Sequence, residues 1–236
     1  MAFTITKVGS GFQNATGITQ TISLSPSITI GQGIIVAIAS NYSIASVAAV
    51  NATFDSVVQQ ISGSTVVWAG VATGIATGTV SSIVVTYSGS ATAEVVVYAI
   101  TGMATSGWQD QTSMNSSSGY YGTNPSIPAT SGSISQQELV FNIFDAGASL
   151  SANGSGYTGL DSIALGGSGF YLITQYEIVS SGNPSGSVTL SSNGNFAGVL
   201  VTLASSSVTP NTVVPETVGS YGSEEFAYFG NVIGGG

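Results

Sequence analysis

The stretch from Thr65 to Met103 reads TVVWAGVATG (65–74), GTVSSIVVTYSG (78–89) and ATAEVVVYAITGM (91–103), with short polar joints between the runs. Each run is rich in β-branched residues, is bounded by Gly, Ser or Thr, and is short for a helix. The stretch therefore predicts three consecutive strands at the centre of an antiparallel β-sandwich.

Similar patterns lie on both sides of this stretch. They occupy residues 2–8, 19–25, 33–40, 44–50, 53–60, 137–147, 169–179, 186–191 and 196–203. The run GIIVAIAS (33–40) is apolar without alternation, which predicts a strand covered on both faces. Glu94 interrupts another apolar run, and we expect its carboxylate on the solvent face or at a sheet edge. About eleven or twelve short strands with glycine-marked turns predict an all-β, antiparallel two-sheet β-sandwich, jelly-roll-like, with a C-terminal extension.

The domain organisation follows from where these patterns end. No shift in composition divides residues 1–204, so we expect one β-sandwich domain there. The extension, 205–236, contains Phe226, Tyr228 and Phe229, and a disordered tail would usually lack such aromatics. We expect it to form an arm or an added strand on a neighbouring subunit. The alternative is that it folds back on its own domain.

The charged residues are few and almost all acidic. The 236 residues include one Lys, no Arg, no His and no Cys, against ten acidic residues, for a net charge of −9. Binding to nucleic acid needs Lys or Arg to neutralise phosphates, so this composition excludes it, together with binding to an anionic membrane surface. The apolar runs fall far short of the ~20 residues that span a bilayer, so no membrane insertion is expected. The N-terminus shows no secretory signal peptide.

Six of the apolar runs carry a resemblance to a known class of module. They are GIIVAIAS, VVWAGVA, SIVVTYSG, AEVVVYAITGM, ELVFNIFDAG and FAGVLVTL, and they span about residues 18–204. Their order resembles a jelly-roll-like β-sandwich module of bacteriophage and viral structural proteins and bacterial surface proteins. The resemblance implies a structural or adhesive unit and brings no catalytic residues with it. The C-terminal extension lies outside it.

The residues that most catalytic sites require are missing. Without His or Cys there is no Ser-His or Cys-His nucleophile and no nitrogen or thiolate zinc site. Paired carboxylates remain, but the sequence has no Glu-x-Glu or Asp-x-Glu pair. Asp145 with Asp161, or Glu94 with Glu177, would converge only through the tertiary structure. We therefore expect no enzyme, no catalytic residue and no cofactor.

Metal binding has only dispersed candidates. A calcium site needs several oxygen ligands, usually from clustered acids. Asp110, Asp145 and Asp161 each lie in or next to a predicted loop, but no Asp-x-Asp-x-Asp loop is present. The sequence therefore predicts no bound metal.

Aromatic residues mark a second candidate contact. The segment 104–135 is polar, turn-rich and too long for an ordinary hairpin loop, and it carries Trp108, Tyr120 and Tyr121. Aromatic side chains in a loop can stack on sugar rings or be buried against another subunit. We favour the subunit contact. Trp68 lies inside an apolar strand pattern and is expected in the core.

Asn-x-Ser/Thr sequons are candidate glycosylation sites. Five occur, at Asn14, Asn41, Asn51, Asn115 and Asn153. Chance alone gives about three in a chain so rich in Asn, Ser and Thr. Their glycosylation would depend on a host that modifies such sites.

The sequence predicts a non-enzymatic structural subunit that self-assembles into a virus particle, as a capsid, decoration or tail component, or into an extracellular filament. Its expected partners are copies of itself and other particle proteins, and its expected location is the virion or an extracellular assembly. A neutral Ser/Thr/Gly surface lacks long-range repulsion, so close packing of copies costs little. With almost no bases, the carboxylates would approach neutrality in acid, which suggests an acidic habitat. The alternative function is a carbohydrate-binding or adhesin module with a glycan partner; a hydrolase would need a carboxylate pair in a cleft.

Overall fold

The protein is built from β-strands. The computed structural model describes residues 2–62, 67–117 and 122–206. In chain order the strands in these ranges are β1 (Thr4–Asn14), β2 (Thr19–Ile28), β3 (Gly33–Ser40), β4 (Ile44–Ala48), β5 (Ala52–Phe54), β6 (Val58–Ser62), β7 (Val67–Ala76), β8 (Val80–Tyr87), β9 (Thr92–Thr101), β10 (Gln109–Ser116), β11 (Ser126–Ile127), β12 (Glu138–Ala146), β13 (Leu150–Asn153), β14 (Thr158–Ala164), β15 (Tyr171–Val179), β16 (Gly186–Leu190) and β17 (Phe196–Ala204). Within these ranges no helix is long and apolar enough to cross a membrane.

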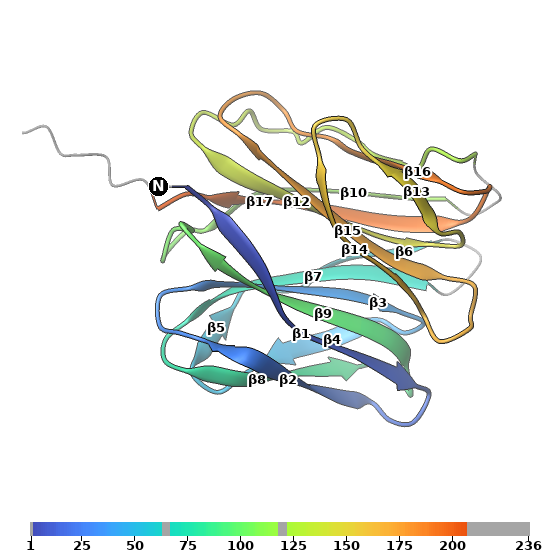
Figure 1. Cartoon of the computed structure of the whole chain (residues 1–236), viewed down its shortest axis with the longest axis horizontal. Coiled ribbons are helices and arrows are strands. Elements are labelled where there is room, and N and C mark those ends of the chain that lie inside the picture. Colours follow the sequence, from blue (N-terminus) through green and yellow to red (C-terminus); the bar gives the residue numbers. More distant parts are fainter. Residues whose placement is uncertain (1, 63–66, 118–121, 207–236) are drawn as a thin grey trace, which may run out of the picture.

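The strands form four antiparallel sheets that stack as four layers (Figure 1). The first outer layer has the order β2-β8-β4, and the inner layer beside it has the order β1-β9-β3-β7-β5, with β6 also paired to β7. The second inner layer is β10-β17-β12-β15-β14, and the second outer layer is β11-β16-β13. The predicted antiparallel β-sandwich class is confirmed, but the expected two sheets are four, because the inner strands bury both of their faces.

The two halves of the chain share one topology. In the N-terminal sandwich (β1–β9) and the C-terminal sandwich (β10–β17), the inner sheet places the last strand between the first and the third. In both, the outer sheet places the penultimate strand between the second and the fourth. Apart from β5–β7 and β14–β15, which stay within the inner sheets, successive strands thus alternate between two facing sheets, which is jelly-roll-like connectivity. Local sequence patterns do not reveal this duplication, because the two halves have similar composition and no linker separates them.

The central strands explain the stacking. In β3, Ile34, Val36 and Ile38 face the core of the N-terminal sandwich, whereas the intervening residues face the C-terminal sandwich. All eight residues of β3 are buried, and so are all nine of β12 and of β17. Side chains alternate across a strand, so an apolar residue at every position requires a cover on each face. The prediction that GIIVAIAS is covered on both faces is confirmed.

We call the interface between the two inner sheets the seam. Its core includes Tyr98 of β9 and Phe141 of β12, whose ring centroids lie 5.7 Å apart in an edge-on arrangement. Separate apolar cores lie between each inner sheet and its outer sheet. The seam is therefore a third hydrophobic core, and it joins the two sandwiches face to face.

Four strands lie where the sequence predicted none. β10 and β11 occupy part of the expected long loop 104–135, and β13 and β14 lie between residues 150 and 164. β10 reads QDQTSMNS, and its half-buried positions carry polar residues such as Gln109 and Gln111. Backbone pairing with β17 holds this strand in place. Its apolar periodicity is too weak to identify it from the sequence.

Candidate functional site

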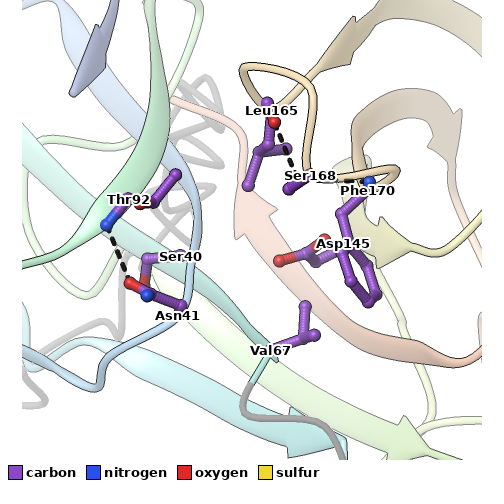
Figure 2. Close-up of a pocket in the computed structure, with 8 residues that line it drawn as sticks. All are labelled: Ser40, Asn41, Val67, Thr92, Asp145, Leu165, Ser168 and Phe170. Atoms are coloured by element: carbon purple, nitrogen blue, oxygen red, sulfur yellow. Dashed lines mark hydrogen bonds between the residues drawn. The ribbon is translucent and has the colours of Figure 1, made fainter. Parts of the chain in front are cut away.

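A pocket of about 170 Å³ lies at one end of the seam. Its walls come from both sandwiches, at the ends of β3 and β12 and the beginnings of β7 and β9, and from the turn between β14 and β15. The lining residues are Ser40, Asn41, Val67, Thr92, Asp145, Leu165, Ser168 and Phe170 (Figure 2). The pocket forms where the apolar strands of the seam end in polar residues.

Asp145 is the charged residue of this pocket. It follows Leu139, Phe141 and Ile143 on the face of β12 that is turned to the seam. Asp145 is 0% exposed, and neither of its carboxylate oxygens has a hydrogen-bond partner among the described residues. Burial raises the pKa of Asp145 well above its ordinary value of 3.8, because desolvation penalises the charged form.

Neutral oxygen-bearing side chains line the pocket with Asp145. Ser40 Oγ donates to the carbonyl of Tyr42, and Ser168 Oγ donates to the carbonyl of Leu165 at 2.6 Å. Asn41 Oδ1 accepts the Thr92 backbone N–H at 2.8 Å. Figure 2 shows the Asp145 carboxylate pointing from its strand toward Ser40 and Asn41 on the other sandwich. These bonds hold the oxygen atoms in place on both sides of the seam.

A glycine turn closes the pocket on the side of β14 and β15. Gly166 has a φ of +42°, and a Cβ added there would collide with the Phe12 ring of β1. Only a residue without a side chain allows the turn to approach the N-terminal sandwich so closely. The turn from Leu165 to Phe170 is thereby placed against the opposite sandwich.

A second polar cluster crosses the seam. Lys7 of β1 forms an ion pair with Asp161 of β14 at 2.7 Å. The Tyr98 hydroxyl donates to the other Asp161 oxygen at 2.6 Å and lies 2.7 Å from Thr174 Oγ1. Burial, together with the bond to Asp161, raises the pKa of Tyr98. The cluster therefore links β1 and β9 to β14 and β15 through charge-assisted hydrogen bonds.

Glu94 faces the same interface. It is 5% exposed, so the prediction of a solvent-facing or edge position is wrong. Burial raises its pKa to about 7; Lys7 opposes this shift and Asp161 adds to it. The sequence suggested an exposed site because a lone acid in an apolar run is usually exposed. Because other sheets cover both faces of β9, the Glu94 side chain is not exposed to solvent.

The aromatic candidates have different positions. Trp108, expected in a loop at a subunit contact, is 9% exposed and belongs to the apolar core of the seam. Its side chain is packed within its own chain, because it immediately precedes β10 and the seam covers it. Tyr120 and Tyr121 lie outside the described residues, as do the arm residues Phe226, Tyr228 and Phe229. Trp68, expected in the core, is half-buried.

The three metal candidates do not form one site. Asp145 lines the seam pocket and Asp161 pairs with Lys7. Asp110 of β10 lies near Glu138, whose pKa is raised by burial and by this neighbouring acid. Among the described residues, no group of three or more His, Cys, Asp or Glu side chains could hold a metal ion. Of the two carboxylate pairs considered for catalysis, neither lines the seam pocket, where Asp145 is the one acid.

The sequons have no common location. Asn14 and Asn153 are exposed at the ends of β1 and β13, and Asn51 is exposed in a turn with a φ of +63°. Asn115 donates to the Ser126 carbonyl at 2.8 Å. Asn41 lines the seam pocket.

The polar lining of the pocket was not predicted as a set. The sequence did contain one signal, an acid in the apolar run VFNIFDAG. Ser40, Asn41, Thr92 and Ser168 are common residue types in this chain, so only the fold brings them together. Compared with known proteins, the chain matches no family model, no curated protein and no solved structure.

Proposed function

We propose that this protein is a non-enzymatic structural subunit that self-assembles into a virus particle or an extracellular filament. The observation that carries the proposal is the stack of two sandwiches of the same topology, joined by an apolar seam into one four-layer block. Three separate apolar cores along the stack favour a stiff building unit. Structural subunits need such stiffness because their contacts repeat through an assembly.

The outer surface supports this proposal. On β2, the exposed positions Thr19, Thr21, Ser23 and Ser25 alternate with the buried residues Gln20, Ile22 and Leu24. The face is thus polar but uncharged, and the whole chain contains one basic side chain. Copies of such a surface can approach with little electrostatic repulsion.

A groove of about 340 Å³ offers a place for the arm of a neighbouring copy. It runs between β4 and the segment that includes β5, and half-buried Val47, Phe54 and Val57 line it. β4 is an edge strand of the outer sheet β2-β8-β4. At the first residue of β4, the Gln59 amide accepts the Ile44 N–H at 2.8 Å and donates to the Ile44 carbonyl at 3.1 Å, so Ile44 is already bonded at this edge. An extended segment can add to a sheet edge, and we propose that 207–236 of another copy pairs with β4 beyond Ile44.

The experiment compares the full chain with a deletion of 213–236. The strands β1 to β17 all lie before residue 213, so we expect the shortened chain to fold with an unchanged far-UV circular dichroism spectrum. The full chain should form concentration-dependent polymers or particles in electron micrographs and in sedimentation, and the deletion should remain monomeric. A full chain that stays monomeric at all concentrations would contradict the proposed function. If the deletion product were unfolded, the result would instead favour the alternative that the segment folds back on its own domain.

The carbohydrate-binding alternative loses its main support. It relied on three aromatic residues of the loop, of which Trp108 is packed in the seam, and Tyr120 and Tyr121 lie outside the described residues. Saturable binding of the full chain to one sugar on a glycan array, without polymers, would reverse this preference.

A further inference from the structure

The buried carboxylate of Asp145 has no basic partner in this chain. An ionised carboxylate is stable in a protein interior when it is paired or coordinated to a metal, and otherwise it takes up a proton. Lys7 is the one basic side chain in the sequence, and it is already bound to Asp161. A counter-ion for the ionised form of Asp145 would therefore have to come from solution.

The polar part of the pocket lining matches a cation better than an anion. Ser40 and Ser168 direct their hydroxyl protons to backbone carbonyls. Ser168 Oγ also accepts the Phe170 N–H at 3.3 Å, which leaves it one lone pair for a ligand. Asn41 Oδ1 uses one lone pair for the Thr92 N–H and keeps a second. Hard cations prefer carboxylate, amide and hydroxyl oxygens of this kind.

We propose that the seam pocket binds one hard, oxygen-preferring cation of the Ca²⁺ class, with Asp145 as its charged ligand and Ser40, Asn41 and Ser168 as neutral oxygen ligands. Ca²⁺ accepts flexible coordination and carbonyl or water oxygens, whereas Mg²⁺ demands near-ideal octahedral geometry and gives up its waters reluctantly. The pocket volume of about 170 Å³ leaves room for an ion that keeps some of its water. A single carboxylate predicts weak rather than buffer-like affinity.

Binding would connect the two sandwiches. Ser40 and Asn41 belong to the N-terminal sandwich, and Asp145 and Ser168 belong to the C-terminal sandwich. The cation would thus link the two sandwiches at the end of the seam, where the apolar contacts stop.

The experiment is calorimetric titration of CaCl₂ into the full chain near neutral pH. We expect saturation at one ion per chain. MgCl₂ titrated in parallel should bind more weakly. The thermal midpoint of the full chain should rise with CaCl₂.

Two matched variants decide the outcome. Asp145→Asn keeps the shape of the side chain and removes its charge, so it should fold and should bind Ca²⁺ weaker by about ten-fold or more. Asp55→Asn removes one carboxylate at an exposed position and should bind like the wild type. Acidic residues elsewhere are the same in both variants, so they cannot produce this difference. The absence of saturable binding by the wild type, or equal binding by the folded Asp145→Asn chain, would overturn the proposal.

Discussion

The two sandwiches have the same strand order but different interiors. The N-terminal core is mainly aliphatic, with residues such as Ile28, Ile83 and Val95. The C-terminal core contains the aromatic pair Phe144 and Phe196, with ring centroids 6.2 Å apart, and it buries the amides of Asn142 and Gln175 in the same region. The alternation of buried and exposed positions therefore specifies this topology, whereas the types of residue that fill each core can vary.

Phe141→Ala should give the largest effect, because it tests whether the two sandwiches behave as one unit. Phe141 is wholly buried in the seam and packs against Tyr98 of the other sandwich. Removal of such a ring should lower the free energy of unfolding by about 3–5 kcal/mol. Urea unfolding followed by circular dichroism measures this loss. Ile30→Ala, at a side chain that is 72% exposed, is the control and should cost far less. Equal losses in the two variants would show that the seam contributes little.

Glu94→Gln tests how Glu94, on the N-terminal side of the seam, makes the free energy of unfolding depend on pH. The pKa of Glu94 is raised from 4.5 to about 7 by burial, so the folded state holds this proton more tightly than the unfolded state. The resulting stability is fully present below about pH 4.5 and is lost as pH rises through about 7. At about pH 8 the ionised group costs on the order of 3 kcal/mol, since one pKa unit corresponds to about 1.4 kcal/mol.

The measurement is urea unfolding of wild type and Glu94→Gln at about pH 4 and about pH 8. The variant should lose less stability between the two conditions than the wild type does. Asp55→Asn removes an exposed carboxylate and is the control for the loss of one acidic side chain. A wild type that is most stable near pH 8 would contradict both this prediction and the suggested acidic habitat.

Gln175→Leu should give a smaller effect, confined to the C-terminal sandwich. The Gln175 amide accepts the Gly154 N–H at 3.0 Å and donates to the Ser187 carbonyl at 2.8 Å. Leucine fills a similar volume but leaves both backbone groups without this partner. The free energy of unfolding should therefore fall by about 1–3 kcal/mol. Denaturant unfolding measures the change, and Gln137→Leu at an exposed position is the control. A variant as stable as the wild type would show that apolar filling serves the C-terminal sandwich equally well.

Much of the fold could be predicted from local patterns. The apolar runs at 33–40, 65–103, 137–147 and 196–203 correspond to central strands, because burial on one or both faces leaves a direct record in the sequence. The polar strand β10 could not be predicted, since its register depends on hydrogen bonds to β17, which is distant along the chain. The candidate site was predicted only as the isolated acid Asp145. Its partners Ser40 and Thr92 reach it through the pairing of β3 with β9 and the stacking of the inner sheets.

The sequence by itself determined that this protein is an antiparallel β-sandwich with many short strands, few charges and a single base. Those properties are local or compositional, so they need no knowledge of which strands meet. The tertiary structure alone decided that there are two sandwiches rather than one, that Glu94 and Trp108 are buried, and that Asp145 faces a pocket between the halves. The physical reason is that a strand's second face is buried only when another sheet covers it, and that contact joins residues far apart in the chain.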